Sequence, residues 1–163
     1  MATTPRKTPA RTASAAKKAQ DAIAMLRADH KKVSGLFEDF EKSRSTAKKK
    51  SIVATICGEL TVHAQLEEEI FYPAVKAALK DRELVPEATV EHATVKDLIA
   101  QLEGVEPDGE MYDAKVKVLS EYIKHHVKEE QNEMFVRAKK TRLDMTELGA
   151  RMAARKSELL GAM

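Results

Sequence analysis

The chain contains four stretches in which apolar residues recur every three or four positions, the spacing of one face of an α-helix. In each stretch the apolar stripe is interrupted near its centre by polar residues. The stripes are, in order, Ile23, Leu26, His30, Val33, Phe37, Phe40; Val53, Ile56, Leu60, His63, Glu67, Ile70; Ala88, His92, Val95, Ile99, Leu102; and Val116, Leu119, Ile123, His126, Glu130, Met134. Four amphipathic helices predict an all-α, up-down four-helix bundle.

Polar segments separate these helices and define three regions of the chain. We expect the bundle to span 21–140, and the segment 141–163 to form a C-terminal helix packed on it, beginning near Thr141 or Asp144, either of which could cap it. Residues 1–20 hold five basic residues, no acidic residue and no large apolar anchor, which predicts a disordered basic tail. A nucleic-acid arm and a transit peptide share this composition, but without aromatic partners the nucleic-acid signal is weak.

The composition narrows the function classes. With one cysteine, Cys57, the chain has no internal disulfide and no cysteine-based metal site, which is consistent with a reducing cytosol. No run of about 18 apolar residues is available to span a membrane, and no apolar N-terminal stretch could serve as a secretory signal. We therefore expect a cytoplasmic protein with no membrane partner.

The two halves of the chain repeat each other. An offset of 62 residues places Asp29-His30 on Glu91-His92, and an offset of 63 places His63 and Glu67 on His126 and Glu130. The repeat also settles the register of the last helix. His125 and Glu129 have the same spacing as His126 and Glu130, but their stripe, with Lys115, Val118 and Tyr122, is less apolar. We therefore assign His126 and Glu130 to the core of a bundle with internal two-fold symmetry.

The polar residues on the apolar stripes are candidate metal ligands. An unpaired buried carboxylate costs several kcal/mol or more, so a partner is needed. A histidine and a glutamate four residues apart share one helix face and can bind the same ion. The candidate ligands are His30, His63, Glu67, His92, His126 and Glu130. The alternative is a buried network of histidine and glutamate hydrogen bonds without metal.

Four imidazoles and two carboxylates suit a pair of first-row ions, and iron's preference for two histidines and a carboxylate matches half of the set. Magnesium and calcium favour oxygen ligands, and structural zinc favours thiolates. Two iron ions would keep open positions for solvent bridges and for dioxygen, peroxide or nitric oxide. Glu59 and Tyr122, one turn before His63 and His126, are additional candidates, either as ligands or partners of ligands, or as half-buried flank residues.

The sequence resembles the hemerythrin-like proteins with the HHE cation-binding domain from about residue 21 to 140. The motifs that carry the resemblance are Asp29-His30, His63-x-x-x-Glu67 with Phe71-Tyr72-Pro73, Glu91-His92, and His126-x-x-x-Glu130 with Phe135. The resemblance implies an up-down four-helix bundle around a non-haem di-iron centre. It also implies that Glu67 and Glu130 bridge the two iron ions, together with an oxo or hydroxo group.

Two positions depart from the oxygen-carrying hemerythrins. Lys96 stands where those proteins have a fifth histidine, and Gln131 stands where they have their last acid. These departures argue against reversible oxygen carriage and favour a protein that binds or senses dioxygen or a related small oxidant. The alternatives are a di-iron enzyme acting on peroxide or nitric oxide, and an iron storage or donor protein. Lys96 is expected either at the surface or near the centre as a proton donor or charge partner.

Overall fold

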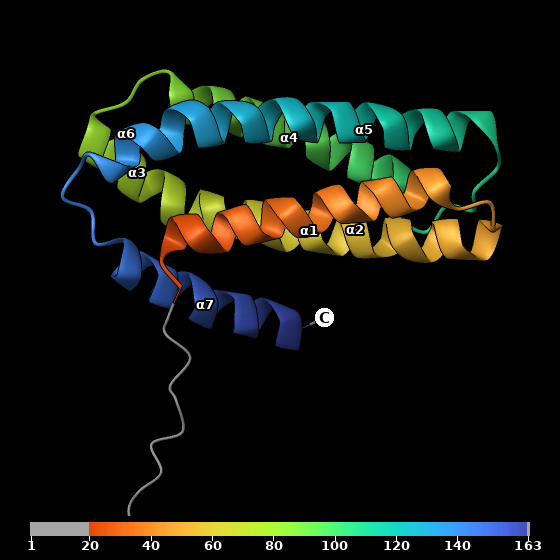
Figure 1. Ribbon diagram of the computed structural model, residues 1–163, viewed down its shortest axis with the longest axis horizontal. Helices are drawn as coiled ribbons and strands as arrows, with labels where there is room; N and C mark the ends of the chain where they lie inside the picture. The colour runs from red at the N-terminus through yellow and green to blue at the C-terminus, as the bar shows by residue number, and fades with distance from the viewer. Residues whose placement is uncertain (1–19, 163) are drawn as a thin grey trace, which may run out of the picture.

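The computed structural model describes residues 20–162, and every regular element in that range is a helix (Figure 1). The elements are α1 (Ala22–Lys42), α2 (Thr46–Leu66), η1 (Glu67–Phe71), α3 (Tyr72–Leu79), α4 (Leu84–Leu102), α5 (Glu110–Glu129), η2 (Glu130–Met134), α6 (Phe135–Lys139) and α7 (Met145–Gly161). Here η1 and η2 are π-helical turns. They join α2 to α3 and α5 to α6 without a break, which leaves four long rods and one extra helix.

The four rods form the predicted up-down bundle, which confirms the fold. α1 packs along α2, and α4 packs along α5. In Figure 1 the four rods run along the long axis of the molecule, with α3 and α6 together at one end and the α1–α2 and α4–α5 connections at the other. Consecutive rods are therefore antiparallel neighbours, as short connections require.

Side-chain caps explain where the helices begin. Asp21 accepts a 2.7 Å hydrogen bond from the Ala24 amide at the start of α1, and Ser45 accepts one from Lys48 at the start of α2. Asp144 accepts a 3.0 Å hydrogen bond from the Glu147 amide. Of the two starting points expected for the C-terminal helix, Asp144 is therefore the cap.

The core of the bundle consists of two apolar clusters. One is built around Leu66, Phe71 and Phe135, and the other around Ile56, Ile99 and Leu119, which lie toward the α1–α2 connection. His30, His63, Glu67, His92, His126 and Glu130 are buried without belonging to either cluster. The polar positions that interrupt each stripe thus form a layer across the bundle, since they lie near the middle of all four rods.

Helix α7 lies outside the four rods and packs against α1, α2 and η1 (Figure 1). It buries Leu148 and Met152. Gly149 allows the closest approach, because a Cβ atom there would lie 2.2 Å from the backbone oxygen of Gln20. The predicted basic tail lies outside the described residues, except for Gln20. Within residues 20–162 no helix has the length and apolar character to cross a membrane.

Candidate metal centre

Each rod of the bundle contributes one histidine to the polar layer. His30 comes from α1, His63 from α2, His92 from α4 and His126 from α5, and Glu67 and Glu130 are the first residues of the two π-turns. All six side chains are buried, with residue exposures between 0% for Glu67 and 9% for His30. The structure thus brings together the six residues that the sequence analysis proposed as ligands.

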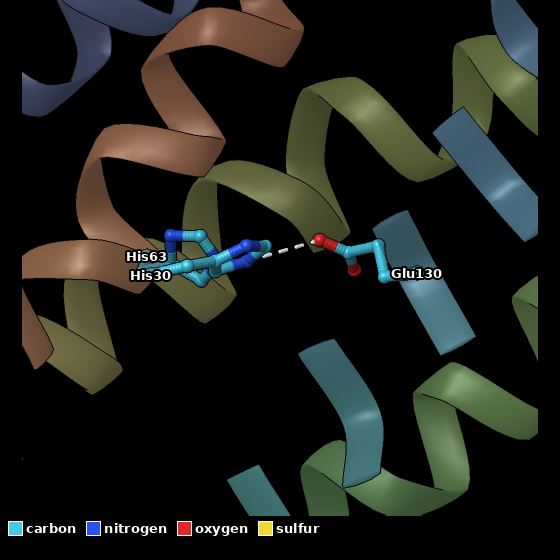
Figure 2. Close-up of side chains that lie close together, drawn as sticks. All are labelled: His30, His63 and Glu130. Carbon is cyan, nitrogen blue, oxygen red and sulfur yellow. Dashed lines mark hydrogen bonds and ion pairs between the residues drawn. The ribbon is translucent and has the colours of Figure 1, made fainter. Parts of the chain in front are cut away.

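The six residues fall into two groups in which one ligand atom of each residue lies within 4.8 Å of the others. The first group is His30, His63 and Glu130, and the second is Glu67, His92 and His126. In each group the histidines come from one half of the chain and the glutamate comes from the other half. Figure 2 shows His30 and His63 directed at Glu130 across the bundle. Each group has the two-histidine, one-carboxylate composition that suits a first-row metal ion.

Both carboxylates reach both pairs of histidines. Glu67 Oε1 lies 2.9 Å from His63 Nε2 and 3.4 Å from His92 Nε2. Glu130 lies with Oε1 3.2 Å from His30 Nε2 and with Oε2 3.1 Å from His126 Nε2. A glutamate in this position can share its carboxylate between two ions, one beside each histidine pair.

A π-turn follows each histidine-glutamate pair and changes which residue faces the centre. The backbone amide of Tyr72 bonds to the Glu67 carbonyl and that of Phe135 to the Glu130 carbonyl, five residues back in both cases. The extra residue in the turn brings these aromatic rings to the core beside the polar layer. Pro73 follows the first π-turn, but the second π-turn forms without any proline, so a turn of this kind does not require one.

Acceptors at the outer ring nitrogens orient three of the four imidazoles. His30 Nδ1 donates to Gln131 Oε1 at 2.9 Å, His63 Nδ1 to Asp29 at 3.0 Å and His126 Nδ1 to Glu91 at 3.3 Å. A protonated Nδ1 leaves the Nε2 lone pair for a metal ion, and such partners fix the ring orientation. Asp29 and Glu91 stand directly before His30 and His92 in the sequence motifs, but the sequence pattern alone indicated no role for them.

The fourth imidazole, that of His92, has no hydrogen bond at Nδ1 within the described part of the chain. The Oε1 atom of Glu68 lies 3.9 Å from this Nδ1. Glu68 also accepts two hydrogen bonds from Lys96, at 2.7 and 2.8 Å. Lys96, with a side chain 53% exposed, therefore lies at the surface and faces the centre only through Glu68.

Tyr72 also lies at the centre, although the sequence pattern did not place it there. Its hydroxyl donates a 2.6 Å hydrogen bond to Glu130 Oε2 and lies 3.2 Å from Nε2 of both His92 and His126. Burial, reinforced by the negative charges of Glu67 and Glu130, raises the pKa of Tyr72 well above its usual range, so the hydroxyl stays protonated in the metal-free protein. One feature of the sequence could have indicated this role. Tyr72 and Phe135 occupy equivalent positions in the repeat, and only Tyr72 carries a hydroxyl group.

Electrostatics couple the histidines to the carboxylates in the metal-free protein. Burial opposes protonation of His63, but the charge of Glu67 and the hydrogen bond to Asp29 outweigh it and raise the pKa of His63 to about 10. Burial likewise opposes protonation of His126, whose hydrogen bonds to Glu130 and Glu91 raise its pKa to about 11. Burial alone would raise the pKa of Glu67, yet the adjacent His63 holds it well below its usual value. Without metal, protons therefore provide the positive charge that these carboxylates need.

The residues present fit a metal ion better than they fit one another. Among the described residues, both oxygens of Glu67 and Oε1 of Glu130 are buried and accept no hydrogen bond of normal geometry. Buried polar atoms are normally satisfied, and an unsatisfied carboxylate oxygen carries a large desolvation cost. The open oxygens lie among inward Nε2 atoms, which is the donor set of a cation site. This supports metal binding over the metal-free network.

A small cavity adjoins the four imidazoles. Its volume is about 30 Å³, enough for one water molecule or a diatomic ligand. Apart from the histidines and Asp29, its walls are aliphatic: Val33, Leu60, Ala64, Val95, Ile123 and Val127. A groove of about 270 Å³ beside α1, α5 and η2 shares His30, Ile123 and Val127 with this cavity and opens to solvent. The arrangement provides a small, largely apolar site beside the imidazoles, with a groove open to solvent next to it.

The other candidates of the sequence analysis lie outside the centre. Glu59 pairs with Lys32 at 2.6 Å on the bundle surface, and Tyr122 is 42% exposed. Among the described residues Glu59 belongs to no group of potential metal ligands, and the exposure of Tyr122 places it on the flank, so both have the position that was the alternative to a ligand role. His125 is exposed and pairs with Glu129 at 3.2 Å, whereas His126 is buried.

Comparison with known proteins agrees with this geometry. The model of the hemerythrin HHE cation-binding domain family matches residues 21–138. The chain belongs to this family, whose members bind metal cations.

A solved structure and a curated protein are similar to this chain. The structure is a hemerythrin HHE cation binding domain-containing protein from Mycobacterium kansasii, which is 26% identical, covers 88% of this chain and 89% of its own, and superposes with a TM-score of 0.73. The curated protein, a DNA nickase of Nostoc sp., is 29% identical over 111 residues, or 68% of this chain. The chain spans only 31% of that relative's length.

Proposed function

We propose that this chain is a non-haem di-iron protein that binds or senses dioxygen or a related small oxidant. One observation carries the proposal: two groups, each of two histidines and a carboxylate, lie beside a 30 Å³ aliphatic cavity inside the bundle. In the proposal His30 and His63 hold one iron ion, His92 and His126 hold the other, and Glu67 and Glu130 span both.

The choice of iron rests on the donor set. Each group offers two imidazole nitrogens and a carboxylate and no thiolate, which suits iron rather than structural zinc or a magnesium or calcium ion. Protein donors leave part of the coordination of two such ions open. When bound, iron supplies the reversible electron transfer and the open positions that a small oxidant needs.

The chain's own residues hold, orient and shield the centre. Asp29, Glu91 and Gln131 fix three imidazoles through Nδ1, so that each Nε2 faces inward. The two apolar clusters exclude water above and below the polar layer. The aliphatic cavity walls favour a weakly polar ligand such as dioxygen or nitric oxide over an ion, because an ion would lose its hydration there.

Two adjacent histidines provide a matched test. The protein is expressed in iron-replete cells, and its iron content and absorption spectrum are measured under nitrogen, air, peroxide and nitric oxide. We expect about two iron ions per chain and a spectrum that changes with at least one of these gases or with peroxide. His126→Ala is expected to lose iron, whereas His125→Ala, which alters the exposed neighbour, is expected to retain it. Less than one iron per chain in the wild type, or equal iron in both variants, would contradict the proposal.

One observation favours a second function, the turnover of peroxide. The Tyr72 hydroxyl lies at the centre as a neutral hydrogen-bond donor to Glu130, next to two imidazoles. A protonated hydroxyl at this place could donate a hydrogen bond to an oxygen atom of a bound oxidant and stabilise the negative charge that develops there during reduction. Continuous consumption of peroxide by the iron-loaded protein, lost in Tyr72→Phe with unchanged iron content, would assign this activity. A single stoichiometric spectral change would leave binding or sensing as the function.

A further inference from the structure

A line of polar contacts leads from the surface helix α7 to an imidazole of the centre. Lys156 Nζ donates a 3.0 Å hydrogen bond to Asp29 Oδ1, and the other oxygen of the same carboxylate accepts a 3.0 Å bond from His63 Nδ1. The Asp29 side chain is 11% exposed, so this contact is sheltered from solvent. Because a carboxylate held at both oxygens cannot rotate freely, the lysine restricts the direction in which Asp29 meets the ring.

The same helix has a second contact beside the centre. Arg155 donates from Nε and from one terminal nitrogen to the two oxygens of Glu69, at 2.8 and 3.2 Å. Glu69 lies in the π-turn η1, which begins with Glu67. Consecutive residues of α7 therefore contact the carboxylate that orients His63 and the turn that presents Glu67.

These contacts break the two-fold symmetry of the centre. In the other half of the repeat, Glu91 takes the place of Asp29 and Asn132 the place of Glu69. Glu91 orients His126 but pairs with no lysine or arginine among residues 20–162, and Asn132 carries no charge. One half of a nearly symmetric site is thus contacted by two basic side chains of α7, and the other half is not. Packing alone would not require a lysine and an arginine at these two points.

We propose that Lys156 is a positioning residue of the metal centre, which holds Asp29 so that His63 presents Nε2 to one of the two metal sites. The inference rests on the proposed role of His63 as a ligand. Through Lys156, α7 controls how firmly the metal site of His63 holds its ion. Displacement of α7 would therefore loosen that site and leave the other in place.

The metal-free protein gives the first test, which does not depend on metal binding. The NMR signals of the protons on Nδ1 of His63 and His126 report the hydrogen bonds to Asp29 and Glu91. In Lys156→Met, which keeps the length of the side chain but removes the donor, we expect the His63 signal to shift or broaden and the His126 signal to stay. Lys156→Arg should restore the wild-type signal. No change at His63 in Lys156→Met, or an equal change at both histidines, would overturn the proposal.

The iron-loaded protein gives the second test. In Lys156→Met we expect the Mössbauer signal of one iron site to change and iron loss to a chelator to become about tenfold faster, the low end of the effect for partners of metal ligands. Arg151→Met, a control on the exposed side of α7, should match the wild type in both measurements, and Lys156→Arg should restore both. An unchanged rate in Lys156→Met, or failure of Lys156→Arg to restore it, would reject the positioning role.

The two tests separate this inference from the proposed function. If the wild type binds no iron, the proposed function fails, and the NMR comparison still decides whether Lys156 positions His63. If Lys156→Met folds poorly, Gly149→Ala provides an independent displacement of α7, because its Cβ would meet the backbone of Gln20 and Ala22. The same selective change at His63 is then expected, and its absence in a folded Gly149→Ala protein would count against the inference.

Discussion

Tyr72 donates a 2.6 Å hydrogen bond to Glu130, which lies 58 residues further along the chain in the other half of the repeat. The position equivalent to Tyr72 is Phe135, so only one of the two glutamates receives a hydroxyl donor from this pair of positions. Both oxygens of Glu67 remain without a hydrogen bond of normal geometry, whereas one oxygen of Glu130 is satisfied. The centre is therefore chemically asymmetric despite its nearly symmetric ligand set.

This relationship predicts the effect of Tyr72→Phe. Removal of the hydroxyl leaves a buried carboxylate oxygen without its donor, which should destabilise the metal-free protein by about 1.5–3 kcal/mol, the usual range for a hydrogen bond to a charged group. Urea unfolding of the metal-free protein measures the change. Tyr112→Phe is the matched control, since Tyr112 is buried in the other apolar cluster and contacts no residue of the centre. An equal loss of stability in both variants would mean that the Tyr72–Glu130 bond contributes nothing specific.

The contacts of Glu67 and Glu130 with histidines of both halves predict that these acids differ from a surface acid in their effect on metal binding. Glu67→Gln and Glu130→Gln each remove a charge that contacts histidines of both halves, so each variant should lose most of its iron. Glu59→Gln changes an acid of the same second rod that pairs only with Lys32 at the surface, and it should keep its iron. Metal analysis of the purified proteins decides between them. Retention of the full iron content by Glu67→Gln would exclude its bridging role.

The sequence predicted the bundle and the six buried polar residues because both depend on helical periodicity. Regular spacing of three and four residues placed His30, His63, His92 and His126 on the inner faces, and the repeat selected the buried member of the pair His125 and His126. Residues three or four positions apart lie on the same face of a helix and are therefore buried together. The sequence spacing alone thus indicates which residues face the core.

Features that depend on a break in that pattern were not predictable. Regular spacing assumes an α-helix throughout, whereas the π-turns insert a residue after Glu67 and Glu130 and bring Tyr72 to the centre. The contact of Lys156 with Asp29 joins residues 127 positions apart and depends on how α7 docks. The spacing of apolar residues does not predict where α7 docks. Gly149 permits the close contact with α1, but a glycine in a sequence does not indicate which segment will pack against it.

The raised pKa values of two histidines predict how metal loading depends on pH. In the metal-free protein the pKa of His63 is about 10 and that of His126 about 11, so both rings are protonated at pH 7. Metal ions bind the deprotonated Nε2, so loading at pH 7 should release about two protons from these rings. Titration calorimetry in buffers of different ionisation enthalpy measures this release. Affinity should rise as pH increases from 7 toward 10, and a release of less than one proton per chain in the wild type at pH 7 would contradict the assignment.

The same pKa values predict the stability of the metal-free protein. For His63 and His126 the folded pKa lies above the unfolded value of 6.5, so their contribution is fully present below pH 6.5 and is lost as pH rises through about 10 and 11. For Glu67 the folded pKa lies below the unfolded value of 4.5, so its contribution is present above pH 4.5 and is lost at lower pH. The free energy of unfolding of the metal-free protein should therefore be greatest between about pH 5 and 6.5. A continued increase from pH 7 to pH 10 would contradict the ion pairs described at the centre.

The aliphatic cavity predicts a separation of ligand binding from metal binding. Val95→Ile adds one methyl group to the wall of a 30 Å³ cavity and leaves the six candidate ligands and Asp29 in the sequence, so the iron content should be unchanged. The added methyl and a small ligand would compete for one volume, and overpacking costs about 1–3 kcal/mol. Since about 1.4 kcal/mol corresponds to a factor of ten, binding of nitric oxide or dioxygen should weaken about tenfold or more. Val53→Ile makes the same change in the same apolar cluster away from the cavity and should leave ligand affinity within about twofold of the wild type. Spectroscopic titration of both iron-loaded variants measures the affinities, and equal affinities would show that the ligand reaches the metal without occupying this cavity.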